Sequence, residues 1–149
     1  MCLPLFSFQC KKKKDIVKSE LTEETQVAEL QEKMQIPEIR IVRTMPTETD
    51  RFHVKGLAIK GDILSIDVEY SGGSKEHTFE LFSNQMLMKS LPPKMTLFLQ
   101  HQANGDLAKA LITKTLLFDL KLLSAPPGTT ILTLNNADEP VELIRPKRK

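Results

Sequence analysis

The sequence predicts an all-β protein: an antiparallel β-sandwich of about seven or eight strands, preceded by a short N-terminal helix or tether. Two observations lead to this class. From residue 38 onward, short apolar and β-branched runs recur at near-regular intervals between clusters of Gly, Pro and Asn. In the same region no stretch of helical periodicity interrupts the runs. A small barrel is the alternative that this pattern leaves open.

The clearest strand covers residues 62–70, where every second residue is apolar and the residues between are mostly polar. The apolar members are Leu64, Ile66, Val68 and Tyr70. Because a strand points successive side chains to opposite faces, this spacing predicts a half-buried strand. The Gly72-Gly73 pair then favours a turn. The sequence predicts that the chain returns as a hairpin along residues 78–82, with His77, Phe79 and Leu81 on one face.

The other strands follow from the same reasoning. The Leu91-Pro92-Pro93 segment predicts a loop that crosses between elements, since proline cannot donate to a ladder. Asn104-Gly105 predicts a type I′ hairpin, because both residues tolerate positive φ. The remaining strands are expected at residues 39–43, 52–59, 95–101, 108–120, 131–134 and 141–144.

Composition limits the class further. A chain of 149 residues is expected to form one domain with tails. It has no tryptophan, which excludes a tryptophan-centred immunoglobulin core. Its two cysteines, Cys2 and Cys10, precede the expected fold, so no structural disulfide is predicted. Metal sites of the Cys-x-x-Cys type are excluded because that spacing does not occur.

Charge is distributed unevenly along the chain. Four lysines stand at 11–14, and four more basic residues occupy the C-terminus between 145 and 149. Without these eight charges, the net charge of +2 becomes −6 for residues 15–144. An acidic body argues against a nucleic-acid groove, and nucleic acid is not an expected partner. The lysine run is compatible with a solvated segment, and a contact with anionic lipid or nucleic acid through it stays open.

The N-terminal segments divide into three parts with different expected roles. Residues 1–10 have the character of a truncated lipoprotein-type signal remnant, an apolar run that ends at Cys10 without a basic region before it. An ordinary terminus is the alternative. Residues 11–37 predict a lysine-rich tether with a possible short helix. The β-sandwich domain is expected at 38–145, followed by a basic tail at 146–149.

Two of the three histidines fall at the inward ends of apolar stripes. His77 ends the stripe that continues with Phe79, and His101 ends the one that includes Leu99. If the hairpins pack face to face, the imidazoles could meet with Asp106 or Glu76 nearby, as a metal site of two histidines and one carboxylate. The alternative is that each histidine caps its strand by hydrogen bonding to a turn. No cofactor is otherwise expected.

Motifs of the common enzyme classes are missing from the sequence. No Gly-x-Ser-x-Gly nucleophile motif occurs, and Ser71-Gly-Gly-Ser74 lacks the lysine and helix of a phosphate-binding loop. The loop at Asn104 lacks the alternating oxygen ligands of a calcium site. We therefore predict that the protein is not an enzyme, with no catalytic residues.

Three stretches, between residues 61 and 120, resemble a family of uncharacterised bacterial envelope lipoproteins. They are Tyr70-Ser-Gly-Gly-Ser-Lys-Glu-His-Thr-Phe-Glu-Leu81, His101-Gln-Ala-Asn-Gly-Asp-Leu-Ala-Lys-Ala-Leu-Ile112 and Leu116-Leu-Phe-Asp-Leu120. The resemblance covers roughly residues 56–134. It implies that family members carry cysteines where this chain has Ser74 and Ala108. By that analogy these two positions lie close together, and Cys10 is a lipid anchor.

Together these features predict a non-enzymatic envelope lipoprotein domain that acts as a binding or accessory module. Its expected partners are the membrane, through a lipid on Cys10, and an unknown protein or glycan ligand. Its expected location is the periplasm-facing or outer surface of the cell envelope. If Met1 is the true start, a cytoplasmic location is expected instead. Metal binding through His77, His101 and Asp106, or an intracellular structural or interaction domain, are the alternative functions.

Overall fold

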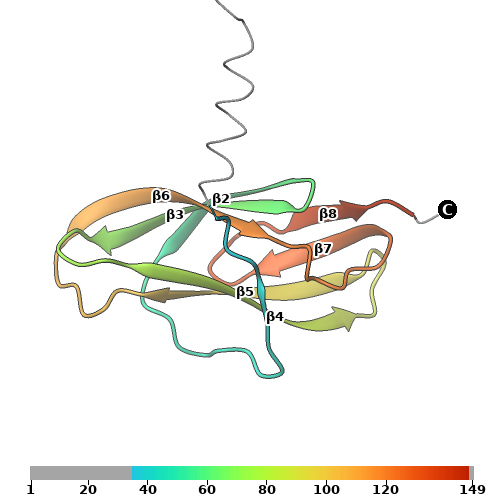
Figure 1. The fold of residues 1–149 in the computed structure, drawn as a ribbon, viewed down its shortest axis with the longest axis horizontal. Coiled ribbons are helices and arrows are strands. Elements are labelled where there is room, and N and C mark those ends of the chain that lie inside the picture. The colour runs from blue at the N-terminus through green and yellow to red at the C-terminus, as the bar shows by residue number, and fades with distance from the viewer. Residues whose placement is uncertain (1–34, 148–149) are drawn as a thin grey trace, which may run out of the picture. The chain divides into compact units, whose positions relative to one another are not determined.

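The computed structural model describes residues 35–147, and these form an all-β fold with eight strands and no helix. The predicted class and strand number are confirmed. Figure 1 shows the strands stacked in two layers. In chain order they are β1 Arg40–Ile41, β2 His53–Lys60, β3 Ile63–Gly72, β4 Thr78–Met88, β5 Lys94–Gln102, β6 Ala110–Asp119, β7 Gly128–Leu134 and β8 Val141–Arg145. The expected signal remnant at 1–10, with Cys10, and all but the last three residues of the tether at 11–37 lie outside the described residues.

One layer is a five-stranded sheet in the order β1-β4-β5-β7-β8, and the other is a three-stranded sheet in the order β2-β3-β6. The sequence predicts an antiparallel sandwich, but two of the strand pairs are parallel. These are the pairs of β1 with β4 and of β5 with β7. The chain leaves the larger sheet after β5, runs through β6 of the smaller one and returns as β7. A return of this kind through another layer is how two parallel strands become neighbours.

The predicted hairpin around Gly72-Gly73 is wrong. β3 pairs with β6 from Ile63↔Asp119 to Gly72↔Ala110, whereas β4 pairs with β5 in the opposite sheet. Residues 73–77 therefore form an arch that joins the two layers. The physical reason is that glycines permit a reversal of the chain without deciding which sheet receives the next strand. An arch lets the apolar stripes of β3 and β4 face each other across the core.

The predicted hairpin at Asn104-Gly105 is wrong for the same reason, although its turn geometry is as expected. Both residues have positive φ, 52° and 67°, and the amide of Asp106 donates to the carbonyl oxygen of Ala103 at 2.9 Å. These are the features of a type I′ turn. The turn nevertheless belongs to a second arch, residues 103–109, because β5 and β6 lie in different sheets.

The segment at Leu91-Pro92-Pro93, predicted as a crossing loop, instead closes a hairpin between β4 and β5 of one sheet. The prolines lie in the connection itself, where no ladder hydrogen bond is required of them. β4 is also longer than the predicted 78–82. It continues to Met88 through an irregularity between Ser83 and Leu87, where the pairing with β5 shifts register.

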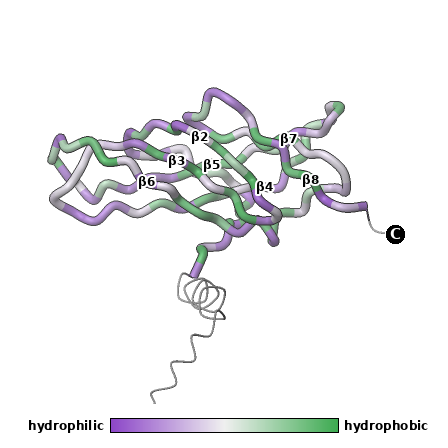
Figure 2. The backbone as a smooth tube through the Cα atoms, turned by 90° about the horizontal axis from the view of Figure 1, so that it is seen from above, coloured by the Kyte–Doolittle hydropathy of each residue, from purple (hydrophilic) through white to green (hydrophobic). Residues whose placement is uncertain are grey.

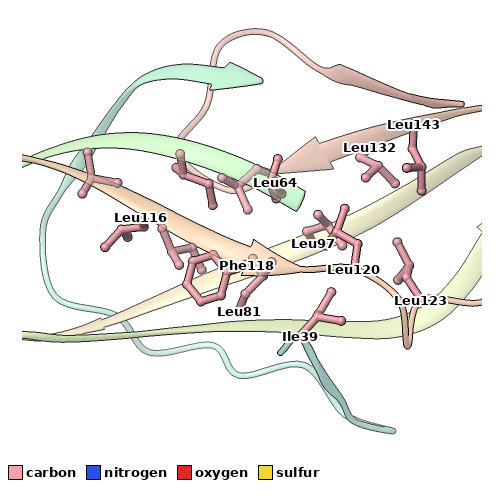
Figure 3. Packing of buried hydrophobic residues seen from close by; sticks show 14 of the residues in the cluster. Ile39, Leu64, Leu81, Leu97, Leu116, Phe118, Leu120, Leu123, Leu132 and Leu143 are labelled. Carbon is pink, nitrogen blue, oxygen red and sulfur yellow. The ribbon is translucent and has the colours of Figure 1, made fainter. Parts of the chain in front are cut away.

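The hydrophobic core fills the space between the two sheets. Hydropathy alternates along the strands, as Figure 2 shows. Figure 3 shows Leu64 and Phe118 of the smaller sheet lying opposite Leu81 and Leu97 of the larger one. Leu120 and Leu123 follow β6 and close the core where the chain crosses back to β7.

Replacing a fully buried core residue is expected to destabilise the fold. Leu64→Ala should lower the free energy of unfolding by about 2–5 kcal/mol, because Leu64 has no exposed surface and its loss leaves a cavity. Urea denaturation measures the change. Leu111→Ala is the matched control in β6, where the side chain is largely exposed, and it should cost no more than about 0.5 kcal/mol. Equal losses in the two variants would contradict the two-layer packing.

Candidate functional site

The two arches lie side by side at one end of the sandwich, because β3 pairs with β6 and β4 pairs with β5. They are tied together by hydrogen bonds in both directions. The Lys75 ammonium donates to the carbonyl oxygens of Asn104 at 2.9 Å and of Gly105 at 3.0 Å. The side-chain amide of Asn104 donates to the carbonyl oxygen of Glu76 at 2.7 Å. We call this end of the domain the arch end.

The carboxylate of Asp106 is the centre of the arch end. Its Oδ2 accepts the backbone amides of Gly73, Ser74 and Lys75 at 2.8, 2.9 and 3.0 Å. Its Oδ1 accepts the amide of Ala108 at 2.8 Å and the hydroxyl of Ser74. These donors, with the Ser74 hydroxyl first, hold the pKa of Asp106 well below its usual range. The carboxylate is therefore ionised at neutral pH.

His77 and His101 continue from Asp106 as a hydrogen-bonded row. His77 Nε2 lies 3.2 Å from Asp106 Oδ2, and His77 Nδ1 lies 2.7 Å from His101 Nε2. An ionised carboxylate only accepts, so His77 Nε2 carries a hydrogen. The 2.7 Å contact then joins His77 Nδ1 to His101 Nε2, with one of these two nitrogens as the donor and the other as the acceptor.

The inner end of the row is surrounded by aromatic rings. His101 is 1% exposed and stacks on Phe79, with ring centroids 4.4 Å apart and planes at 5°. Tyr70 and Phe52 contact the same imidazole at centroid distances of 5.1 and 5.9 Å. Burial, followed by the neighbouring charge of His77, lowers the pKa of His101. His101 Nδ1 has no hydrogen-bond partner among the described residues.

Gly72 is required by this packing. A Cβ atom at this position would lie 2.4 Å from His77 Nε2 and 3.2 Å from Asp106 Oδ2. Any side chain would therefore push the imidazole away from the carboxylate. The glycine pair that the sequence presents as a turn signal thus has a second role, which is the close approach of His77 to the backbone.

The structure brings together His77, His101 and Asp106, the three residues that the sequence suggested as metal ligands. They form a row rather than a ring around one point, and no group of three or more His, Cys, Asp or Glu within residues 35–147 is arranged to hold a metal ion. Ser74 and Ala108, the positions implied by the resemblance, bind the same Asp106 oxygen. Glu76 contributes its backbone carbonyl.

Sequence reasoning missed the aromatic surroundings and the backbone support of His101. Tyr70 was placed on an apolar stripe without a link to the histidines, and Phe52 only began a strand. The amide of His101 donates to the Thr49 hydroxyl at 2.9 Å, and its carbonyl accepts the amide of Asp50 at 2.9 Å. No periodic signal marks residues 49–50, which lie in a loop.

The arrangement has the residue types of a catalytic relay but not the access that catalysis needs. The His77 and Asp106 side chains are 2% and 0% exposed. The Ser74 hydroxyl donates to Asp106 and not to an imidazole nitrogen that could activate it. The row is therefore suited to holding the two arches in one geometry.

Comparison with known proteins finds solved structures that are similar to this chain but does not assign the chain to a family. No family model and no curated protein matches the chain. A NigD-like immunity protein from Bacteroides caccae has 17% identity and a TM-score of 0.46, over 64% of this chain and 50% of that one. A protein of unknown function (DUF1344) from Bacteroides vulgatus has 17% identity and a TM-score of 0.46, over 68% and 50%.

A third solved structure, a provisionally named toxin-related protein from Parabacteroides distasonis, has 19% identity and a TM-score of 0.49 over 72% of this chain and 60% of that one. The chain thus spans 50–60% of the length of these proteins.

Within residues 35–147 no helix is long and apolar enough to cross a membrane.

Lowering the pH is expected to destabilise the fold. Because the pKa of His101 is lowered in the folded state, the unfolded chain takes up its proton more readily, and stability falls as the pH drops below about 6.5. One proton gives a slope of at most about 1.4 kcal/mol per pH unit. The lowered pKa of Asp106 adds a second loss below about pH 4.

Thermal unfolding of His101→Phe between about pH 7.5 and 5 tests the first of these losses. Phenylalanine fits the aromatic surroundings but does not titrate, so the slope below about pH 6.5 should flatten even though the variant is less stable overall. His53→Gln, at an exposed position of β2, is the control and should keep the slope. An unchanged slope in His101→Phe would show that another group titrates.

A zinc titration tests whether the histidines bind a metal ion or serve only to hold the strand ends by hydrogen bonds. We expect excess Zn²⁺ to leave the melting temperature unchanged, because both ring nitrogens of His77 and Nε2 of His101 are already engaged in hydrogen bonds. A zinc-dependent rise in melting temperature that disappears in His77→Ala would instead support the metal-binding hypothesis.

Proposed function

We propose that this chain is a domain of a bacterial envelope lipoprotein, attached to the membrane by a lipid on Cys10, which acts as a non-enzymatic binding or accessory module. The ligand in this proposal is a protein or glycan that the outer surface of the sandwich recognises. The β-sandwich supplies a rigid scaffold whose loops and edges are free for such contacts.

The low solvent exposure of the hydrogen-bonded row at the arch end is the observation that supports a function without catalysis. Asp106, His77 and His101 form a cluster with catalytic side-chain types, and it is almost fully enclosed. A general base must come within hydrogen-bond reach of a substrate proton. His101 Nδ1, the ring nitrogen without a partner within residues 35–147, is buried, and the ring that carries it packs against Phe52 and Phe79.

The sequence of the N-terminus supports the lipid anchor. An apolar run ends at Cys10 and is followed at once by four lysines, an arrangement that resembles the junction between signal and tether in lipoproteins. Residues 11–37 would span at most about 90–100 Å if fully extended. A tether of that reach would allow the domain to bind a ligand either at the bilayer or well above it.

Intact mass measurement on separated membrane and soluble fractions tests the anchor. The full reading frame, including any codons upstream of Met1, is expressed in the native host. We expect a membrane-bound species that begins at Cys10 and carries acyl chains. Cys10→Ser should move the protein to the soluble fraction, and Cys2→Ser should leave it membrane-bound. A soluble species that begins at Met1 with two free thiols would contradict the proposal and favour an intracellular interaction domain.

A further inference from the structure

Exposed apolar side chains gather at the end of the sandwich opposite the arches, where β4 and β5 are joined. We call this group the apolar tip. It consists of Met86, Leu87, Met88, Leu91 and Leu122. Leu91 is 100% exposed at the turn of the hairpin. Figure 1 shows this hairpin and the end of β8 pointing the same way.

The backbone holds the apolar side chains of the tip outward. Gln85 has a φ of 56°, which is rare for a residue other than glycine or asparagine. Its amide donates to the Ser83 hydroxyl at 3.1 Å, and the amide of Met86 donates to the Asn84 side chain at 3.1 Å. The Gln85 side chain donates to the carbonyl oxygen of Leu122 at 3.0 Å. The last of these bonds joins the hairpin to the segment that carries Leu122.

Lysines flank the apolar tip. Residues 86–94 include Lys89 and Lys94 but no acidic residue, although the chain from 15 to 144 has a net charge of −6. Within residues 35–147 neither lysine forms an ion pair. Two further basic residues, Arg145 and Lys147, stand at the end of β8, which β7 separates from β5, and Arg145 is paired with Asp62 at 3.4 Å.

We infer that the apolar tip is a contact surface for an anionic lipid bilayer. The fully exposed Leu91 and the partly exposed Met86 and Met88 can enter the acyl region, while the lysines beside them remain among negatively charged headgroups. A protein partner would need a pocket for a projecting hairpin. A bilayer accepts it without one, and its negative surface complements the local positive charge in an otherwise acidic body.

This inference deepens the proposed function and rests on it in one respect, since a lipid on Cys10 would keep the domain close to a bilayer. The contact would then orient the domain, with the tip at the membrane and the arch end away from it. The binding itself needs no acyl chain, so the two proposals can fail separately.

Vesicle flotation of the full-length Cys10→Ser chain tests the contact. The vesicles are phosphatidylcholine alone or phosphatidylcholine mixed with phosphatidylglycerol. We expect flotation with the mixed vesicles and a loss of at least about fivefold in Leu91→Asp. Leu107→Asp is the matched control, because Leu107 is 89% exposed at the arch end, and it should float like the parent.

Charge variants complete the experiment. Lys89→Glu combined with Lys94→Glu should reduce flotation with the mixed vesicles, whereas Lys109→Glu combined with Lys114→Glu should not. The inference is overturned if Leu91→Asp floats like its parent, or if Leu107→Asp loses as much. It is also overturned if replacing the lysines at 11–14 by glutamine alone abolishes binding, or if neither vesicle binds the chain, which would favour a protein partner.

Discussion

The hydrogen bonds of the Asp106 carboxylate are the constraint on which the arch end of the domain depends. An arch between two sheets has no partner strand, so the backbone amides of residues 73–75 have no ladder acceptor. One carboxylate from the neighbouring arch accepts all three. Placing a charged group away from water is in turn tolerated because Ser74, Ala108 and His77 complete its hydrogen bonds. The first arch thereby supplies the hydrogen-bond donors for Asp106, and the second arch supplies the acceptor for residues 73–75.

The rest of the arch end follows from this anchor. Asp106 accepts a hydrogen bond from His77, His77 is hydrogen-bonded in turn to His101, and the His101 ring packs flat on Phe79. The polar row thus ends in an aromatic cluster that belongs to the core. A row of this kind couples the geometry of the loops to the packing of the sandwich, since neither imidazole can turn without losing a buried hydrogen bond. The same closure that makes the row rigid also keeps a substrate away from it.

The sequence predicts the features that are local and leaves out those that depend on partners distant in the chain. Alternation from Leu64 to Tyr70 depends only on the strand itself, and Asn104-Gly105 depends only on its turn, so the sequence predicts this strand and this turn geometry correctly. Which strand lies beside β3 depends on the whole core, and both expected hairpins are arches. The inward histidines were found from their stripes. The role of Asp106 as an acceptor for a loop some thirty residues away carries no periodic signal.

The two ends of the sandwich differ in the side chains that they expose to solvent, and this difference bears on how the domain works. At the arch end the Asp106 carboxylate and the amides around it are paired within the fold, although Leu107 is exposed there. At the apolar tip several apolar side chains are exposed on one hairpin. Gln85, a residue with an unfavourable φ, is held by side-chain hydrogen bonds in the same hairpin whose apolar side chains are exposed. Strain and exposed apolar surface both cost stability, and they coincide on one hairpin. Such a coincidence is expected where a surface is maintained for contact with something outside the chain.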